Sequence, residues 1–372
     1  MSTSLEIHRF SGTHTEIGEQ YGRACRERVA RHLELALAKL AAAGVGAREA
    51  TETALAYRPF VAQHAPFLDE EIAGVAAGAG ITRAEAYLLQ LRAEVFADLL
   101  GGPGAQNECT TFAIEPAAAR DGIALAGQNA DLPEIYEEVM VVVEFAPTNG
   151  RRVLMAVPAG QVSYIGINDA GMAVFANFLH CRAWSRGFPR YLLSRFALEH
   201  PTVDAALAAL RALPRASSRN LLLIGPDGKA VDFENTPTRD ALILPTKGVL
   251  VHSNHYLSAK LIDEEASRGE YLRNSRVRLS RIRQLLGAVE EPLDREALAR
   301  IMRDRRDAPD ALSVESRDLP DEFAPPEGNY MTVCAVIAEP SKGRMWVTSG
   351  PPSRADYMPY TFSDHPQDLP VL

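Results

Sequence analysis

Cys109 is the residue of this chain whose setting best suits nucleophilic chemistry. It begins the run CTTFAI, whose β-branched and aromatic residues predict a strand, and it follows the Gly-rich segment GGPGAQNE, residues 101–108. A cysteine attacks as its thiolate, and a strand start beside a loop leaves the sulfur accessible. Free cysteines are more often inert and buried. For Cys109, the preceding loop and the abrupt change in composition at this point make a nucleophilic role a serious alternative to that of an inert buried cysteine.

The other three cysteines have no such setting. Cys25 lies in a predicted helix, Cys334 lies in the apolar strand MTVCAVIA, and Cys181 follows His180 without further context. We interpret all three as ordinary buried thiols. Four cysteines in 372 residues are too few for a disulfide scaffold, so we expect a reducing compartment, the cytoplasm.

The pattern GQNAD, residues 127–131, offers polar groups that can assist a nucleophile. We expect it to end a strand at a turn, where Asn129 and Asp131 orient a base or donate hydrogen bonds. The alternative is that Gly, Asn and Asp are simply the residues that turns require. By itself the pattern does not decide between the two.

A third polar cluster is VHSNHY, residues 251–256, at the end of an apolar run. His252 and His255 suggest a metal site, but no further His, Cys or Glu completes a ligand set in the sequence around them. Asn254 is the more interesting member. A side-chain amide can donate to the oxyanion of acyl transfer, and losing such a donor costs about 10²–10³ in rate.

The elements that must position these residues change in character near residue 100. Residues 15–100 are rich in Ala, Leu, Glu and Arg with apolar spacings of three and four, which predicts amphipathic helices, one opened by a capping box of Thr82 and Glu85. Beyond Cys109, the predicted strands lie in the segments 109–114, 122–129, 139–147, 151–158, 171–178, 220–234, 241–253 and 330–350. Predicted helices lie at about 189–200, 202–212, 270–287 and 293–303. Strands and helices in blocks predict a layered α+β fold. We expect residues 303–329 to form a long surface loop.

Four motifs in this order resemble one known family. They are ECTTFAI, GQNAD, HSNHY and the closing TVCAVIAEP and GRMWVTSGPP, and the N-terminal SGTHTEIGEQYG has the same texture. Together they are similar to the peptidase C45 family of N-terminal nucleophile (Ntn) hydrolases, the family of acyl-coenzyme A:6-aminopenicillanic acid acyltransferase. The resemblance covers nearly the whole chain.

The resemblance implies a four-layer αββα Ntn-hydrolase sandwich preceded by a mainly helical N-terminal segment. It implies an autocatalytic cleavage between Glu108 and Cys109, which turns residues 1–108 into a helical α chain and residues 109–372 into the catalytic β chain. The two fragments would remain together as an αβ heterodimer. In the family pattern Cys109 is the nucleophile, Asn254 the oxyanion-hole asparagine, and Asp131 the residue that orients the nucleophile or assists proton transfer. The freed α-amine, with a reference pKa of about 7.7–8.0, serves as the base.

Two positions depart from the family pattern. Glu108 replaces the glycine that commonly precedes the nucleophile, and a carboxylate there can slow cleavage or assist it. Ala130 replaces the tryptophan of the usual GQNWD, which removes an aromatic wall from the acyl pocket. The resemblance therefore does not imply that this protein transfers the side chain of penicillin.

The remaining sequence features narrow the function. A net charge of −9 argues against a large nucleic-acid-binding surface, and the sequence holds neither a P-loop nor a dinucleotide fingerprint. No segment has the pattern of a membrane span or a signal peptide. We expect an amidohydrolase or acyltransferase that acts on a small N-acyl amine, amino acid or peptide, without a bound cofactor and with acyl-CoA as a candidate co-substrate. The alternatives are an unprocessed member of the family that serves as a binding protein, and a metalloenzyme that rests on His252 and His255 alone.

Overall fold

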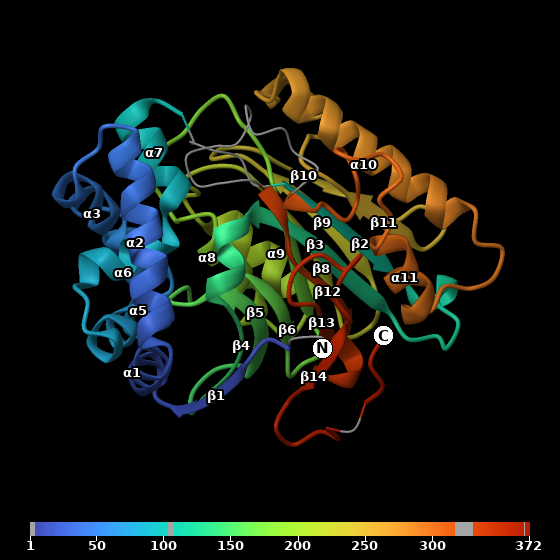
Figure 1. The fold of residues 1–372 in the computed structure, drawn as a ribbon, viewed down its shortest axis with the longest axis horizontal. Helices are drawn as coiled ribbons and strands as arrows, with labels where there is room; N and C mark the ends of the chain where they lie inside the picture. Colours follow the sequence, from blue (N-terminus) through green and yellow to red (C-terminus); the bar gives the residue numbers. More distant parts are fainter. Residues whose placement is uncertain (1–3, 103–107, 317–329, 368) are drawn as a thin grey trace.

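Two β-sheets lie face to face at the centre of the molecule (Figure 1). The structure is a computed structural model that describes residues 4–102, 108–316, 330–367 and 369–372. One sheet has eight strands in the order β1-β4-β5-β6-β7-β8-β9-β10, and the other has six in the order β11-β2-β3-β12-β13-β14. The strands of the eight-stranded sheet are β1 (Ile7–Gly12), β4 (Met140–Pro147), β5 (Val153–Pro158), β6 (Ile165–Asn168), β7 (Ala173–Phe178), β8 (Arg219–Ile224), β9 (Ala230–Asn235) and β10 (Asp240–Ile243). Those of the six-stranded sheet are β2 (Glu108–Ile114), β3 (Leu125–Pro133), β11 (Val249–His252), β12 (Tyr330–Glu339), β13 (Arg344–Val347) and β14 (Met358–Thr361).

Helices cover the outer faces of both sheets. Helix α8 (Leu192–Leu198) packs on β6 and β7, and α9 (Val203–Ala212) packs beside it. Helices α10 (Gly269–Gly287) and α11 (Arg295–Met302) lie across the six-stranded sheet on the opposite side of the molecule (Figure 1). The layers therefore run helix, sheet, sheet, helix, and the expected αββα sandwich is confirmed.

Alternation along each inner strand fills two separate cores. In β2, Ala113 belongs to the large core cluster, whereas Phe112 and Ile114 pack with residues of α10 and α11 such as Ile282 and Leu298. This is the period-two pattern of a strand buried on both faces. The side chain of Cys109 therefore shares a face with Thr111, which bonds to β7 across the gap between the two sheets.

The N-terminal segment is mainly helical, as expected. Its helices are α1 (His14–Ala24), α2 (Arg26–Ala42), α3 (Ala47–Leu55), α4 (Arg58–His64), α5 (Pro66–Ala79), α6 (Arg83–Gln90) and α7 (Arg92–Leu100). The capping box of Thr82 and Glu85 opens α6 as predicted, but the helix ends at Gln90 and a second one follows after Leu91. Helices α1 and α5 cross in close contact because Gly18 and Gly74 leave no Cβ at the crossing: a Cβ on Gly18 would lie 2.2 Å from the Glu71 carbonyl oxygen.

Strand β1 ties this helical segment into the sandwich. It pairs in parallel with β4 at the edge of the eight-stranded sheet, which the sequence did not indicate. Further bonds join the helices to the loop after β5: the Tyr21 hydroxyl accepts from the Gly160 amide at 2.9 Å, and Gln90 Nε2 donates to the Gly160 carbonyl at 2.8 Å. Residues 1–108 are thus held by the sandwich through many contacts besides the covalent chain.

Three sequence expectations are corrected by the sheets. The pattern GQNAD does not end a strand: it lies inside β3, the inner strand between β2 and β12. The predicted strand segment 241–253 forms two strands, β10 and β11, which belong to different sheets. Within the expected surface loop, residues 310–315 are buried, because the carbonyl of Leu312 accepts from the Asn129 side chain at 2.8 Å. Residues 317–329 and the connection at 103–107 lie outside the described part of the chain.

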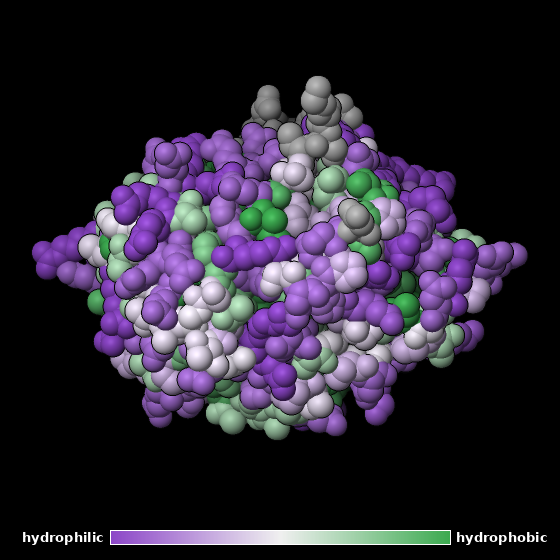
Figure 2. All heavy atoms as spheres, turned by 90° about the horizontal axis from the view of Figure 1, so that it is seen from below, coloured by the Kyte–Doolittle hydropathy of each residue, from purple (hydrophilic) through white to green (hydrophobic). Residues whose placement is uncertain are grey.

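The face shown in Figure 2 is mostly hydrophilic, and its hydrophobic residues lie in small separate patches. Among the described residues, no helix is long and apolar enough to cross a membrane.

Candidate active site

Cys109 occupies the second position of β2, with β11 on one side and β3 on the other. In the register of β2 and β3, Cys109 lies opposite Ala130, and Glu108 lies opposite Asp131. Directly opposite residues share a face of the sheet. Ala130 therefore adjoins Cys109 on the side that faces the other sheet, so the family's tryptophan at this position would stand beside the nucleophile.

Asn254 holds the backbone nitrogen of Cys109. Its Oδ1 accepts a hydrogen bond from the Cys109 N–H at 2.7 Å and a second from Arg278 Nη2 at 2.8 Å. Since both partners are donors, the amide orientation follows from the network. Asn254 Nδ2 then donates to the carbonyl of Phe178 at 3.0 Å. The structure brings Asn254 to Cys109, but the amide presents its oxygen, not the N–H₂ expected of an oxyanion-hole donor, to Cys109.

Arg278 of α10 is a member of the site that the sequence analysis missed. Its Nη1 donates to the Cys109 carbonyl at 2.8 Å and to Thr110 Oγ1 at 2.9 Å, and the side chain is fully buried. The available signal was helical spacing. Ser275, Arg278, Leu279 and Ile282 all lie on the buried face of α10. In a segment with five arginines, only the tertiary structure shows which of them faces inward.

A chain of polar side chains links Cys109 to the eight-stranded sheet. Asn177 Nδ2 donates to the Cys109 carbonyl at 3.1 Å, while its Oδ1 accepts from Thr111 Oγ1 at 2.9 Å and from Asn220 Nδ2 at 3.0 Å. Asn220 also donates to Asp232 at 2.6 Å. All these side chains are buried, so each bond also satisfies a group that water cannot reach. The backbone of Cys109 is thereby fixed at its nitrogen and at its oxygen.

The thiol itself is buried, which corrects the expectation of an accessible sulfur. Cys109 is 3% exposed in the uncleaved chain. Burial and, to a lesser degree, the negative charge of Asp131 raise its pKa to about 12, although Arg278 and Arg219 oppose the shift. At neutral pH the sulfur is therefore a thiol, and it needs a base before it can attack.

Asp131 lies one residue along β3 from the position opposite Cys109. It is 1% exposed and accepts a hydrogen bond from Thr332 Oγ1 of β12 at 2.5 Å. Asn129 serves packing instead: its Nδ2 donates to the carbonyls of Met302 and Leu312, at 3.0 and 2.8 Å. Of the two polar residues in GQNAD, the structure brings Asp131 to the nucleophile and uses Asn129 to anchor the outer helix layer.

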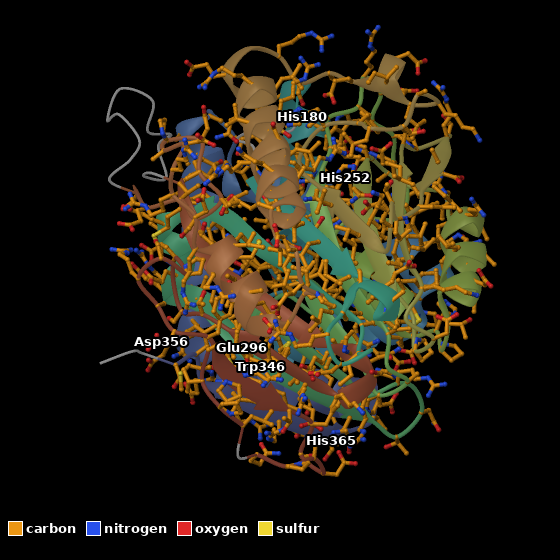
Figure 3. The ribbon with its side chains drawn as sticks, turned by 90° about the vertical axis from the view of Figure 1, so that its right-hand side faces the viewer. His180, His252, Glu296, Trp346, Asp356 and His365 are labelled. Atoms are coloured by element: carbon orange, nitrogen blue, oxygen red, sulfur yellow. The ribbon has the colours of Figure 1, made fainter. Side chains whose placement is uncertain are left out.

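The two histidines of HSNH have separate partners. His252 Nε2 lies 2.9 Å from Glu234 Oε1, and His255 Nδ1 lies 2.7 Å from Ser275 Oγ. Figure 3 places His252 inside the molecule, toward the same end as His180 and away from Trp346 and His365. Within the described ranges, no group of three His, Cys, Asp or Glu side chains is arranged to hold a metal ion.

The buried pair of His252 and Glu234 predicts a pH-dependent stability. Burial alone lowers the pKa of His252, but the charge of Asp232 and the bond to Glu234 raise it above its ordinary value. The folded state then binds a proton that the unfolded state has released, so this stabilisation is present below about pH 6.5 and is lost as pH rises through the folded pKa. We expect the difference in free energy of unfolding between the parent and His252→Gln to shrink above pH 6.5, by at most about 1.4 kcal/mol per pH unit.

Urea unfolding at half-unit intervals from pH 6 to 8 measures this difference. His255→Gln is the matched control, because burial lowers the pKa of His255 to about 3 and its dependence has the opposite sign. A parent-to-His252→Gln difference that is flat across this range would contradict a charged His252.

The other three cysteines are buried free thiols, as expected. Cys334 of β12 lies opposite Ala130, on the side of β3 away from β2. It is therefore close to the site, but it does not bond to the backbone of Cys109. Burial raises the pKa of Cys25 to about 12. Neither thiol has the polar surroundings that distinguish Cys109.

Two facing sheets with outer helices, and a buried cysteine at the start of an inner strand, define the class of the Ntn hydrolases. Comparison with known families makes the assignment narrower. The model of the acyl-coenzyme A:6-aminopenicillanic acid acyltransferase family matches residues 118–354, and the chain belongs to this family. The matched range includes Asp131, Asn254 and Arg278, while Cys109 lies nine residues before it begins.

Individual relatives are distant. The chain is 27% identical over 249 residues to the acyl-coenzyme A:6-aminopenicillanic-acid-acyltransferase 40 kDa form of Emericella nidulans, which covers 66% of this chain and 68% of the relative. Among solved structures, a mutant of conjugated bile acid hydrolase from Clostridium perfringens matches with a TM-score of 0.48 at 14% identity, over 71% of this chain and 95% of the other. Penicillin V acylase from Agrobacterium tumefaciens matches with a TM-score of 0.45 at 13% identity, over 65% and 83%.

Proposed function

We propose that this protein is a self-processing cysteine hydrolase or acyltransferase that acts on the amide bond of a small N-acyl amine, amino acid or peptide. The observation that carries the proposal is the pair of bonds on the Cys109 backbone. Asn254 accepts from its nitrogen and Arg278 donates to its carbonyl, all within a buried polar site. The N–H and C=O groups of a purely structural cysteine in a strand normally bond to the backbone of the neighbouring strands, so they need no side-chain partners.

Processing begins in the uncleaved chain. The Cys109 sulfur attacks the carbonyl carbon of Glu108, the C–N bond to Cys109 breaks, and the nitrogen leaves as the new α-amine. Water then hydrolyses the Glu108 thioester, which returns the thiol and leaves a carboxylate on Glu108. We assign to Asp131 the role of taking the proton of the buried thiol, because its charge is close enough to affect the thiol, whose pKa of about 12 requires such help.

Turnover repeats this chemistry on a substrate. The α-amine of Cys109, with a reference pKa of about 7.7–8.0, is half neutral near physiological pH and serves as the general base. Asn254 Oδ1 already accepts from this nitrogen and would hold the free amine beside the sulfur. The acyl group passes to the Cys109 sulfur as a thioester, the amine product leaves, and water or an amine acceptor takes the acyl group. The match to a relative named acyl-coenzyme A:6-aminopenicillanic-acid-acyltransferase supports acyl-CoA as an alternative donor. With that donor, the coenzyme A thiol leaves when the acyl group passes to the Cys109 sulfur.

The two atoms of the Asn254 amide predict different losses in two variants. Asn254→Ala removes both the acceptor for the Cys109 nitrogen and the N–H₂ donor, and we expect turnover to fall about 10²–10³-fold. Asn254→Asp keeps an acceptor for the amine and for Arg278 but loses the donor. If the amide acts as oxyanion donor, Asp is as impaired as Ala; if it only holds the amine, Asp retains most activity.

Single-turnover acylation of Cys109, followed by intact mass, measures both variants. Asn274→Ala is the matched control, since Asn274 accepts from Arg278 Nε at 2.7 Å but does not touch Cys109. Full activity in Asn254→Ala would contradict any role of this side chain.

The fragments of such a cleavage would stay together. Residues 1–108 contribute β1 to the eight-stranded sheet, and His32 Nδ1 lies 2.7 Å from the Ala159 carbonyl. The buried Arg195 of α8 bridges to Glu71 of α5 at 3.3 Å, which ties the helical segment to the outer helix layer. We therefore propose an αβ heterodimer of residues 1–108 and 109–372 as the active form, with no bound cofactor. An intact wild-type chain after prolonged incubation would instead favour the second candidate, an unprocessed binding protein.

A further inference from the structure

Two arginines close to the proposed nucleophile are buried without an anion. Arg190 is 3% exposed and Arg219 is 4% exposed. Among the residues that the structure describes, neither guanidinium group donates a hydrogen bond or forms an ion pair, and Nε and Nη1 of Arg190 and Nε of Arg219 are enclosed without a partner. A buried cation without a counter-charge is strongly unfavourable, so such groups persist where a ligand supplies the charge.

Both arginines lie next to the groups that hold Cys109. The Phe178 carbonyl accepts from Asn254, and the Phe178 ring lies 3.8 Å from the Arg190 guanidinium carbon. Arg219 begins β8 directly opposite Phe178 in the sheet, and its charge lowers the pKa of Cys109. The cluster thus begins at Phe178, which contacts both Asn254 and Arg190, where β7 ends and β8 begins.

The surroundings of this cluster suit an anion with an organic body. Aromatic rings flank the charges: Tyr191 lies 5.1 Å from the Arg190 guanidinium and 4.7 Å from that of Arg219. His180, in edge contact with Phe178, has its pKa lowered by burial to about 3 and adds no competing charge. The nearby Glu94 accepts from the Arg190 backbone N–H at 2.9 Å through Oε1, and its Oε2 is buried without a hydrogen-bond partner. In the described part of the chain, this carboxylate forms no ion pair with either guanidinium group.

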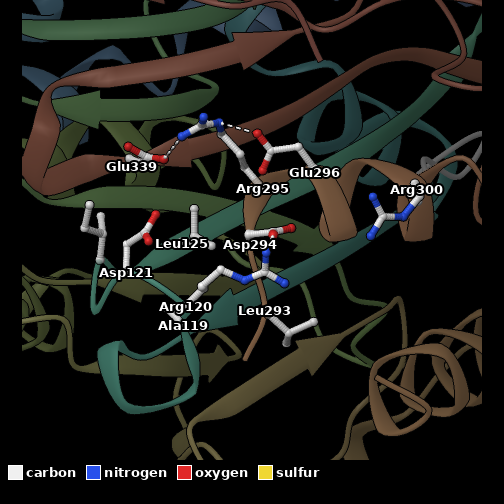
Figure 4. Close-up of a pocket in the computed structure, with 11 residues that line it drawn as sticks. Ala119, Arg120, Asp121, Leu125, Leu293, Asp294, Arg295, Glu296, Arg300 and Glu339 are labelled. Atoms are coloured by element: carbon white, nitrogen blue, oxygen red, sulfur yellow. Dashed lines mark hydrogen bonds and ion pairs between the residues drawn. The ribbon is translucent and has the colours of Figure 1, made fainter. Parts of the chain in front are cut away.

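Other arginines of the chain show what a paired guanidinium looks like here. Buried Arg215 donates to the carbonyls of Thr236, Leu210 and Arg239. In the cavity of about 500 Å³ beside α11, Arg295 bridges Glu339 and Glu296 (Figure 4), and Arg120 pairs with Glu291 and Asp294. Arg120 and Arg295 thus have carboxylate partners within the protein. Arg190 and Arg219 have no such partners among the described residues.

We propose that Arg190 and Arg219 form a subsite for a carboxylate of the substrate, so that the protein acts on anionic N-acyl compounds in preference to neutral ones. This inference rests on the proposed function for its reaction. It adds the class of substrate, since a bidentate guanidinium matches a carboxylate and the aromatic rings accommodate the attached carbon skeleton. The carboxylate can belong to the amine part or to the acyl part of the substrate.

Matched substrate pairs decide the question. N-phenylacetylglycine against N-phenylacetylglycinamide tests a carboxylate on the amine part, and glutaryl 4-nitroanilide against pentanoyl 4-nitroanilide tests one on the acyl part. We expect the processed parent to prefer the anionic member of one pair in kcat/KM. Arg190→Met and Arg219→Met should each lose about 10- to 100-fold on that member, as for a hydrogen bond to a charged group, and little on the neutral one.

A chemical probe keeps the subsite testable if no amide is turned over. Iodoacetate and iodoacetamide both alkylate a thiol with loss of iodide and differ only in the carboxylate. Relative to free cysteine, Cys109 of the processed parent should favour iodoacetate, and Arg190→Met should abolish that preference. Absence of both cleavage and Cys109 acylation would defeat the proposed function, whereas equal rates for anionic and neutral members in every pair would overturn the subsite alone.

Stability provides the control for a merely structural role. Arg215→Met, which leaves three buried carbonyls without their donor, should lower the thermal midpoint and leave the anion preference intact. Arg190→Met removes an uncompensated charge, and its midpoint should be no lower than that of the parent. A large loss of stability in Arg190→Met, with the preference unchanged, would show that this arginine is structural.

Discussion

Cys109→Ala is expected to leave the chain as a single species of 372 residues, where the parent yields fragments of 108 and 264 residues. Without the sulfur, no atom near the Glu108 carbonyl can form the thioester, and turnover falls by at least about 10³-fold because water lacks both the nucleophile and its base. Denaturing electrophoresis and intact mass follow the cleavage. Fold stability should hardly change, since the backbone bonds to Asn254 and Arg278 remain.

Cys334→Ala is the matched control for this experiment. Cys334 is a fully buried thiol on β12, close enough to Cys109 for a charge there to raise the pKa of Cys334, but it lies on the other side of β3. We expect this variant to split like the parent. If Cys109→Ala still splits into two fragments, or if only Cys334→Ala stays intact, Cys109 is not the nucleophile of the cleavage.

Arg278→Met is expected to combine a loss of cleavage with a large loss of stability. The fully buried guanidinium serves the Cys109 carbonyl, Thr110 Oγ1 and Asn254 Oδ1 at once. Removing one partner of a buried charged network leaves groups that nothing else reaches, which typically costs about 3–5 kcal/mol. The scissile carbonyl is also no longer held in position, and a displacement of about 1 Å is enough to slow a reaction about 10²-fold.

Chemical unfolding and the rate of appearance of the fragments measure the two effects separately. Arg281→Met, on the same helix, is the matched control: Arg281 binds Asp304 at 2.8 and 2.6 Å and does not touch Cys109. It should lose stability but split at the parental rate. Equal cleavage in both variants would mean that Arg278 supports only the fold.

The guanidinium groups around Cys109 therefore divide into two kinds. Arg278 has every described acceptor it needs within the protein, and its position is fixed before any substrate arrives. Arg190 and Arg219 have none among the described residues. Two buried cations without a counter-charge destabilise the fold, and a negatively charged substrate group would offset this cost. This is the physical reason to expect a preference for anionic substrates at this site.

Ala130 bears on the shape of the same site. It is fully buried and lies opposite Cys109 on one side and Cys334 on the other. A larger side chain at this position would occupy the space between the sheets beside the sulfur. The small residue is compatible with a substrate that differs from those of family members carrying an aromatic wall.

The sequence by itself determined the element types and the family. Helical spacing located the ends of α9, α10 and α11 to within about two residues and those of the shorter α8 to within about three, and the run CTTFAI placed Cys109 near the start of a strand. These predictions succeeded because local propensity and period depend on neighbours along the chain. The order of the four motifs identified the Ntn-hydrolase family. The structure brings Asn254, which the resemblance singles out, to the backbone of Cys109.

Only the tertiary structure decided which polar groups meet. GQNAD looks like a turn because its residues favour turns, yet it forms a central strand. There Gln128 Oε1 accepts from the Ala176 N–H across the sheets, and Asn129 donates to two carbonyls of the outer layer. Arg278 is one of five arginines on α10, and Arg190 and Arg219 stand in apolar segments far from Cys109 in sequence. Whether a charged side chain has a partner depends on contacts between residues far apart in the sequence, which neither composition nor periodicity shows. The proposed carboxylate subsite could therefore not be predicted from the sequence.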